Sequence, residues 1–325
     1  MIETTGLRKS FRSRAPHRGA VWSGRAVKIV EAVRGVDLRV ARGEIFGFLG
    51  PNGAGKTTTL RMLATLIEPE DGEAKVAGAD LRRQPGEVRR RIGYVAQGGS
   101  TWGEVTAREE LVLQARMYGI GKAEAQRRAE RALATFRLVE YADRKCRTYS
   151  GGQRRRVDIA LGIIHEPQLV FLDEPTAGLD PQSRANLWDE VRRLRAEGRT
   201  VFLTTHYLEE ADALCDRIAI IDYGEIVAEG TPAALKREIS GDVVTVGLGG
   251  AAATAAEALE GQPYVRKLET QDGGLRLYVD TGATAVPQIM RRLEAANISL
   301  DSIEVHRPSL DDVFLAKTGR SLRED

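Results

Sequence analysis

The stretch Gly50-Pro51-Asn52-Gly53-Ala54-Gly55-Lys56-Thr57 matches the complete pattern G-x-x-x-x-G-K-[ST], and it follows the apolar run Ile-Phe-Gly-Phe-Leu at residues 45–49. The run is typical of a buried strand, so the motif is predicted to join a strand to a helix. Glycines let successive backbone N–H groups face phosphate oxygens, and the positive end of the following helix attracts the same anion. The stretch therefore predicts a phosphate-binding loop, or P-loop, which includes the next residue, Thr58.

Two side chains of this loop carry specific chemistry. Lys56 is predicted to reach the β and γ phosphates of a nucleotide. Thr57 is predicted to offer its hydroxyl to Mg²⁺, a hard cation that prefers oxygen ligands. The alternative is a glycine-rich strand-to-helix turn with an incidental lysine, and the acidic residues described below argue against it.

Composition limits the class of protein. With 325 residues and 42% hydrophobic content, the chain is long enough for about two domains of roughly 150 residues each. The formal charge of +2 implies neither nucleic acid nor an anionic membrane as a partner. Cys146 and Cys215 are predicted to be reduced thiols. Because no signal peptide pattern and no run of ~18 apolar residues is present, we expect any membrane span to come from another chain.

The hydrophobic pattern predicts a parallel sheet in the first part of the chain. Residues 35–40 alternate as a strand does, and residues 107–140 show a mainly helical spacing that is broken at Gly119 and Gly121. The runs at 169–172 and 200–204 are continuously apolar. Such strands are typical of a parallel sheet that is covered on both faces.

The pattern changes after residue 232. Strands at 243–246, 264–270, 275–279 and 298–305 and helices at 251–259 and 283–296 give the order βαββαβ. Ser309 is predicted to cap a last helix at 310–318. We therefore expect two domains, an α/β domain at 1–235 and a small α+β domain at 242–325.

Residues 12–26 form a basic segment with turn residues, Pro16, Gly19 and Gly24, among its arginines. A solvated hairpin extension is one interpretation. Contact with lipid headgroups or with a partner protein is the other.

Two adjacent acids follow the apolar run at 169–172. Because the carboxyl ends of parallel strands meet at one edge of a sheet, we expect Asp173 and Glu174 to lie beside the P-loop. Asp173 is predicted to hold Mg²⁺ directly or through water. Glu174 is predicted to orient and deprotonate the water that attacks the nucleotide.

A second anion site is predicted at Tyr149-Ser150-Gly151-Gly152-Gln153, because a serine and two glycines open a helix there. This stretch resembles the signature of the ATP-binding cassette (ABC) family, Leu-Ser-Gly-Gly-Gln, and departs from it only at Tyr149. The resemblance covers residues 1 to about 235. It implies a P-loop NTPase fold with a parallel-sheet core and with antiparallel β and helical subdomains, and it implies ATP and Mg²⁺ as ligands.

The resemblance also implies roles for four more residues. Gln97 matches the glutamine that faces Mg²⁺ and the water, and His206 matches the histidine that contacts the γ-phosphate. Asp180 matches the loop that joins two active sites across a dimer. Phe11 occupies the usual place of the aromatic residue that stacks on adenine, although Trp22 is an alternative.

Residues 62–66, 89–93 and 308–315 look like those of the bacterial daunorubicin-resistance type of exporter ATPase. That resemblance implies a homodimer in which each ATP lies between the P-loop of one subunit and the signature of the other. It further implies a separate transmembrane permease, export of a drug-like or hydrophobic compound, a place on the cytoplasmic face of the plasma membrane, and no nucleic-acid partner. The alternatives are an ABC ATPase that acts on ribosomes or DNA, and an importer ATPase.

Overall fold

The structure is a computed structural model that describes residues 1–14, 27–239, 241–249, 251–271, 273–306 and 308–319. It divides into two compact units, Met1–Glu229 and the residues from Gly230 onward. Trp22 and most of the basic segment at 12–26 lie outside the described residues. Arg12 and Arg14 belong to a strand rather than to a loop, because β1 continues to Arg14 and pairs with β2.

The first unit is built on a six-stranded sheet in the order β10-β9-β3-β8-β7-β6. Its strands are β3 (Ile45–Leu49), β6 (Ile92–Val95), β7 (Leu169–Asp173), β8 (Thr200–Thr205), β9 (Arg217–Asp222) and β10 (Glu225–Gly230). The pairs β9–β3, β3–β8, β8–β7 and β7–β6 are parallel, and every residue of β3, β7 and β8 is buried. The predicted parallel sheet is confirmed, and it brings the ends of β3, β7 and β8 to one edge.

A second sheet of the first unit is antiparallel and has the order β2-β1-β4-β5. It consists of β1 (Ile2–Arg14), β2 (Val27–Val40), β4 (Asp71–Val76) and β5 (Ala79–Asp80). One hydrophobic core joins the two sheets, and its largest members include Phe46, Phe48, Phe171 and Phe202. The rings of Phe46 and Phe202 stack with centroids 5.7 Å apart. The core therefore fixes the strand that precedes the P-loop against the strand that precedes His206.

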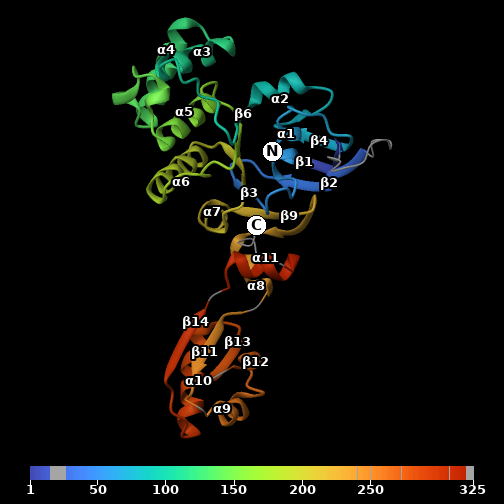
Figure 1. The fold of residues 1–325 in the computed structure, drawn as a ribbon, viewed down its shortest axis with the longest axis vertical. Helices are drawn as coiled ribbons and strands as arrows, with labels where there is room; N and C mark the ends of the chain where they lie inside the picture. Colours follow the sequence, from blue (N-terminus) through green and yellow to red (C-terminus); the bar gives the residue numbers. More distant parts are fainter. Residues whose placement is uncertain (15–26, 240, 250, 272, 307, 320–325) are drawn as a thin grey trace, which may run out of the picture. The chain divides into compact units, whose positions relative to one another are not determined.

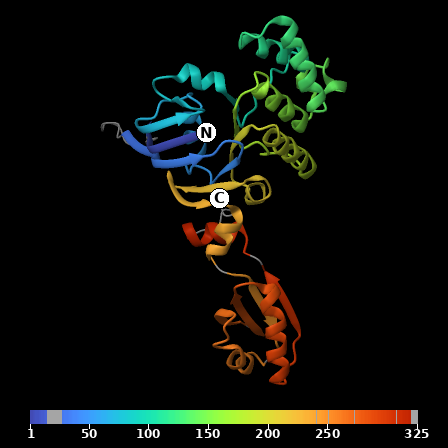
Figure 2. The ribbon, with the colours of Figure 1, turned by 180° about the vertical axis from the view of Figure 1, so that it is seen from behind.

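The remaining helices of this unit are α1 (Lys56–Leu63), α2 (Pro85–Arg91), α3 (Ala107–Met117), α4 (Lys122–Thr135), α5 (Gly151–Ile163), α6 (Pro181–Ala196) and α7 (Leu208–Leu214), with short 3₁₀ turns η1 (Val139–Tyr141) and η2 (Cys146–Thr148). The predicted helical segment is confirmed: Thr106 caps α3 in a reciprocal box with Glu109, and Gly119 has a φ of 80° between α3 and α4. Helices α3, α4 and α5 lie on one side of the unit and β1, β2 and β4 on the other (Figure 1), and the view from behind agrees (Figure 2).

The second unit contains the predicted βαββαβ order: β11 (Val243–Gly247), α9 (Ala252–Leu259), β12 (Val265–Gln271), β13 (Gly274–Val279), α10 (Gly282–Ala295) and β14 (Ser302–His306). Its antiparallel sheet has the order β12-β13-β11-β14. The last strand begins at Ser302 rather than at 298, because the Ile298 N–H bonds to the carbonyl of Leu293 and completes the end of α10. Ile298 and Leu300 still pack against the core.

Two further helices, α8 (Pro232–Ile239) and α11 (Leu310–Thr318), contact each other in the second unit. Ser309 caps α11 in a reciprocal box with Asp312, as the sequence predicts. Among the described residues, no helix has both the length and the apolar character that crossing a membrane requires.

Candidate functional site

The P-loop runs from the end of β3 to the start of α1 and depends on glycine at two close approaches. A Cβ added at Gly50 would lie 2.3 Å from the carbonyl oxygen of Ile221 on β9. Gly55 has a φ of 108°, and a Cβ there would lie 2.3 Å from the carbonyl oxygen of Ala32 on β2. Gly55 is also the N-cap of α1 and provides no side-chain cap, so the N–H groups of the first turn face the loop.

Gly55→Ala is expected to destabilise the protein, because the new methyl group would meet backbone that cannot rotate away and because φ is positive. Backbone strain of this kind costs about 1–3 kcal/mol. The matched control is Gly53→Ala, where φ is 80° but no atom lies within 4 Å of the new Cβ. Chemical denaturation measures both free energies of unfolding. An equal loss in the two variants would contradict the close approach to Ala32.

Lys56 is buried in the loop and has three oxygen neighbours. Its Nζ donates to the carbonyls of Gly50 at 2.7 Å and Pro51 at 3.0 Å, and it lies 3.5 Å from Oε1 of Glu174. Burial lowers the pKa of Lys56, and the neighbouring Glu174 carboxylate opposes that shift. The ammonium group is therefore held against the P-loop and can exchange these oxygens for those of a phosphate.

The two predicted acids lie at the end of β7, beside the P-loop. Thr57 Oγ1 donates to Oδ1 of Asp173 at 3.0 Å. Thr204, on the neighbouring strand β8, also donates to Oδ1 of Asp173, at 2.7 Å, and its hydroxyl accepts the N–H of Glu174 at 3.0 Å. Thr204 thus connects the two acids, and sequence reasoning did not predict its part in the site.

Glu174 is the centre of the polar cluster. Gln97 Nε2 donates to its Oε2 at 2.7 Å, and Nδ1 of His206 lies 3.2 Å from the same oxygen. Burial raises the pKa of Glu174, but His206 and Lys56 outweigh burial and hold the pKa below its ordinary value. The residue has a φ of 42°, which is unusual for a side chain with a Cβ. The carboxylate is therefore ionised near neutral pH and is fixed by neighbours on three sides.

A pocket of about 260 Å³ joins the loop to this cluster. It is lined by Ala32, Asn52, Gly53, Gly55, Lys56, Thr57, Thr58, Gln97 and Glu174. Backbone N–H groups, one ammonium group, hydroxyls and a carboxylate share this cavity. Such a donor set can bind a phosphate chain and activate a water molecule next to it.

The signature residues lie elsewhere in the same unit, at the start of α5. Ser150 caps this helix: its hydroxyl accepts the N–H of Gln153 at 3.2 Å, and Gln153 Oε1 accepts the N–H of Ser150 at 2.9 Å. Ser150 and Gly151 are exposed, and none of the signature residues lines the pocket. Tyr149, the position that departs from the family pattern, is buried and donates its hydroxyl to the carbonyl of Tyr141. Burial raises the pKa of Tyr149 to about 12.

Asp180 caps the neighbouring helix α6. Its Oδ1 accepts the N–H of Ser183 at 2.9 Å, and its Oδ2 accepts the Ser183 hydroxyl at 2.6 Å. The starts of α5 and α6 are adjacent, since a Cβ added at Gly152 would lie 2.7 Å from Ser183 Oγ. The signature and Asp180 therefore form one exposed group that is separate from the pocket.

Phe11 lies on β1, opposite Val30 of β2, and is exposed. Lys9 Nζ lies 5.7 Å from the centroid of its ring. Phe11 is not among the residues that line the P-loop pocket, so its stacking on adenine remains a prediction.

Arg155 is a second site residue that sequence reasoning missed. It lies on α5 and hydrogen-bonds to backbone carbonyls on both sides of Glu174. The only signal in the sequence is its place in the Arg154-Arg155-Arg156 run after the signature. A run of arginines more often forms a solvated face, so the buried member cannot be recognised without the fold.

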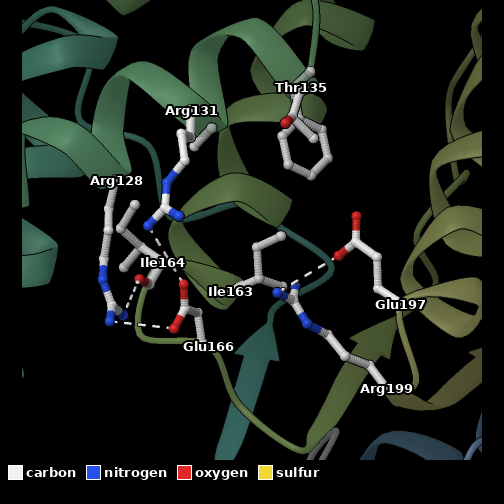
Figure 3. A pocket seen from close by; sticks show the side chains of 10 residues that line it. Arg128, Arg131, Thr135, Ile163, Ile164, Glu166, Glu197 and Arg199 are labelled. Carbon is white, nitrogen blue, oxygen red and sulfur yellow. Dashed lines mark hydrogen bonds and ion pairs between the residues drawn. The ribbon is translucent and has the colours of Figure 1, made fainter.

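A further pocket lies between α4 and the ends of α5 and α6 (Figure 3). Its charged residues form ion pairs: Arg128 and Arg131 contact Glu166, and Arg199 contacts Glu197. None of the predicted site residues lines this pocket.

Comparisons with known proteins agree with this geometry. The family profile described as "ABC transporter" matches residues 33–177, and the profile "ATP-binding protein DrrA1-3-like, C-terminal domain" matches residues 230–318. The daunorubicin resistance ATP-binding protein DrrA3 of Streptomyces coeruleorubidus is 44% identical over 297 residues, which are 90% of this chain and 93% of that protein. The daunorubicin/doxorubicin resistance ATP-binding protein DrrA of Streptomyces peucetius is 42% identical in an alignment that covers 98% of this chain and 92% of that protein.

A dimeric ATP-binding cassette, solved in a post-hydrolysis state bound to ADP and Pi, superposes with a TM-score of 0.61 at 26% identity. The match covers 71% of this chain and 98% of that one. The fold carries a P-loop, an acid pair at a strand end and a signature helix. Two relatives are more than 40% identical over most of the chain, which shows the family. The chain belongs to the ABC transporter family and is an ATP-binding and ATP-hydrolysing subunit of it.

Proposed function

We propose that two copies of this chain hydrolyse Mg²⁺-bound ATP between them, and that the cycle powers export of a drug-like or hydrophobic compound through a separate transmembrane permease. The observation that carries this proposal is the separation of the two anion sites. The pocket holds Lys56 and Glu174, whereas the signature residues Ser150 and Gly151 are exposed and lie outside it. Each copy thus has one complete P-loop pocket and one exposed signature.

In the P-loop pocket, the loop N–H groups and Lys56 bind the phosphates of ATP. The donors around Asp173 suit Mg²⁺, because the Thr57 hydroxyl already contacts the Asp173 carboxylate at 3.0 Å and both are hard oxygen ligands. The Gln97 amide would complete the set. When bound, the ion neutralises phosphate charge and orients the γ-phosphate.

Glu174 acts as the base that takes a proton from the attacking water. Its lowered pKa and its contacts with Gln97 and His206 support this role, since the carboxylate is ionised and fixed in direction. His206 then contacts the γ-phosphate, and Phe11 stacks on adenine.

The signature of the second copy closes the site. Ser150 to Gln153 bring a helix N-terminus to the γ-phosphate, where preorganised donors stabilise the charge that develops during hydrolysis. Asp180, at the adjacent helix start, connects the two sites across the dimer. The dimer is closed when ATP is bound and opens after hydrolysis, and the conformation of the permease changes with these two states.

Residues 1–235 form the ATP-binding domain in this proposal, and residues 242–325 form an accessory domain. The compact units and the two family profiles support this division. The dimer works at the cytoplasmic face of the plasma membrane, bound to the permease. The names of the related proteins support the export of a drug rather than an action on ribosomes or DNA, and rather than the import of a nutrient.

The test is drug transport in inside-out membrane vesicles that contain the chain and the polytopic membrane protein that copurifies with it. Doxorubicin fluorescence reports accumulation. We expect ATP-dependent uptake into these vesicles and none with Glu174→Gln. Absence of any copurifying membrane protein would favour the ribosome or DNA alternative, and ATP-driven movement out of the vesicles would favour an importer.

A further inference from the structure

We infer that Arg155 and Asp158 are positioning residues for ATP hydrolysis: from one turn of α5 they hold the two backbone segments that carry Glu174 and Gln97. The inference rests on the proposed roles of Glu174 and Gln97. It adds a physical link between these residues and the helix that begins with the signature, because α5 starts at Gly151 and packs beside β6 (Figure 1).

Arg155 holds the segment around Glu174. Its Nε donates to the carbonyl of Pro175 at 2.8 Å, and its Nη2 donates to the carbonyl of Asp173 at 2.9 Å. These two carbonyls flank Glu174, whose φ of 42° is unusual for a residue with a side chain. Two donors on one rigid guanidinium plane therefore fix the backbone on both sides of the proposed base.

The same guanidinium group reaches the other segment. Nη1 of Arg155 donates to the carbonyl of Ala96, the residue before Gln97, at 2.6 Å. Only 6% of Arg155 is exposed, so these three carbonyls replace water as its partners. Burying this cation without hydrogen-bond partners would cost free energy. The position of α5 therefore depends on the three carbonyls keeping their places.

Asp158 holds the far side of Gln97. Only 4% of it is exposed, and its Oδ1 accepts the N–H groups of Ser100 at 2.8 Å and Thr101 at 3.0 Å. The hydroxyls of Thr101 and Ser100 also donate to Oδ1, at 2.6 Å and 3.3 Å. Gly99, with a φ of 76°, allows this approach, since a Cβ there would lie 2.9 Å from Oδ2.

Gln97 therefore lies between a carbonyl held by Arg155 and two N–H groups held by Asp158, and both of these residues belong to α5. Glu174 lies between two further carbonyls that Arg155 holds. The Gln97–Glu174 hydrogen bond of 2.7 Å depends on both segments keeping their places. A misplacement of about 1 Å at such a contact costs about 100-fold in rate. The positioning residues are thus expected to act on the rate of hydrolysis and not on the affinity for ATP, since neither lines the pocket.

The test compares steady-state kcat with the Kd for a nonhydrolysable ATP analogue. Arg155→Lys keeps the charge but cannot span three carbonyls, and Asp158→Asn keeps the shape but weakens the acceptor. We expect each to lower kcat by about 10- to 100-fold with Kd within about threefold of wild type. The matched control is Arg128→Lys on α4, because Arg128 donates to the carbonyl of Ile164 and contacts neither Gln97, Glu174 nor the signature; its kcat stays close to wild type.

The experiment is repeated in the Glu174→Gln background. If Arg155 acts through the base, Arg155→Lys lowers the residual rate there by less than threefold, because residues that act as a unit are not additive. Normal kcat in both Arg155→Lys and Asp158→Asn, alongside lost turnover in Glu174→Gln, would overturn the positioning role alone. So would an equal loss in both backgrounds. Retained turnover in Glu174→Gln would overturn the proposed base and, with it, the positioning role.

Discussion

The Glu174→Gln variant is expected to lose steady-state ATP turnover by about 10²- to 10⁴-fold, the range that a general base contributes. The amide has nearly the shape of the carboxylate and can still contact Gln97, but it cannot accept a proton from water. Binding of ATP is expected to persist, because Lys56 keeps its two loop carbonyls at 2.7 Å and 3.0 Å. Phosphate release measures turnover, and fluorescence of a labelled ATP analogue measures affinity.

Glu209→Gln on α7 is the matched control for this result. The substitution is the same, and Glu209 is exposed. Turnover close to wild type is expected there. If Glu174→Gln retained its rate under conditions in which the control also did, another group would have to be the base.

Lys56→Ala is expected to weaken the binding of ATP itself. Hydrogen bonds to a charged group contribute about 1.5–3 kcal/mol, which corresponds to about 10- to 100-fold in Kd. The variant also leaves the buried Glu174 carboxylate without the cation that lies 3.5 Å away. We therefore expect the pKa of Glu174 to rise in the variant, because Lys56 is one of the groups that lower it.

Isothermal titration with ATP measures this loss of affinity. Lys75→Ala provides the control, since Lys75 is an exposed residue of β4. Unchanged ATP affinity in Lys56→Ala would remove the basis for the P-loop pocket. The two main variants are thus expected to separate binding from hydrolysis: Lys56→Ala acts on Kd, and Glu174→Gln acts on kcat.

Much of the fold could be predicted because its signals are local. The apolar runs at 45–49 and 169–172 are followed directly by the P-loop and the acid pair, and parallel strands place their carboxyl ends together. The contacts of Lys56 and Glu174 follow from that rule. The βαββαβ order of the second unit was equally local, since each strand or helix has its own period and turn residues.

What could not be predicted depends on contacts between distant residues. Thr204 looks like the end of an apolar strand, and only its neighbour β7 shows that its hydroxyl joins Asp173 to the N–H of Glu174. Arg155 is one arginine among three, and its burial follows from packing against the end of β7. A positive φ at Glu174 has no signature in the sequence at all.

The mass of the Glu174→Gln protein in solution, measured by sedimentation with and without ATP, tests the central claim that the site is shared by two chains. We expect a monomer near 35.6 kDa without nucleotide and twice that mass with ATP. Ser150→Arg in the same background should bind ATP and remain monomeric, because it blocks the signature and leaves the P-loop pocket intact. A Glu174→Gln protein that binds ATP and stays at the monomer mass would contradict the shared site.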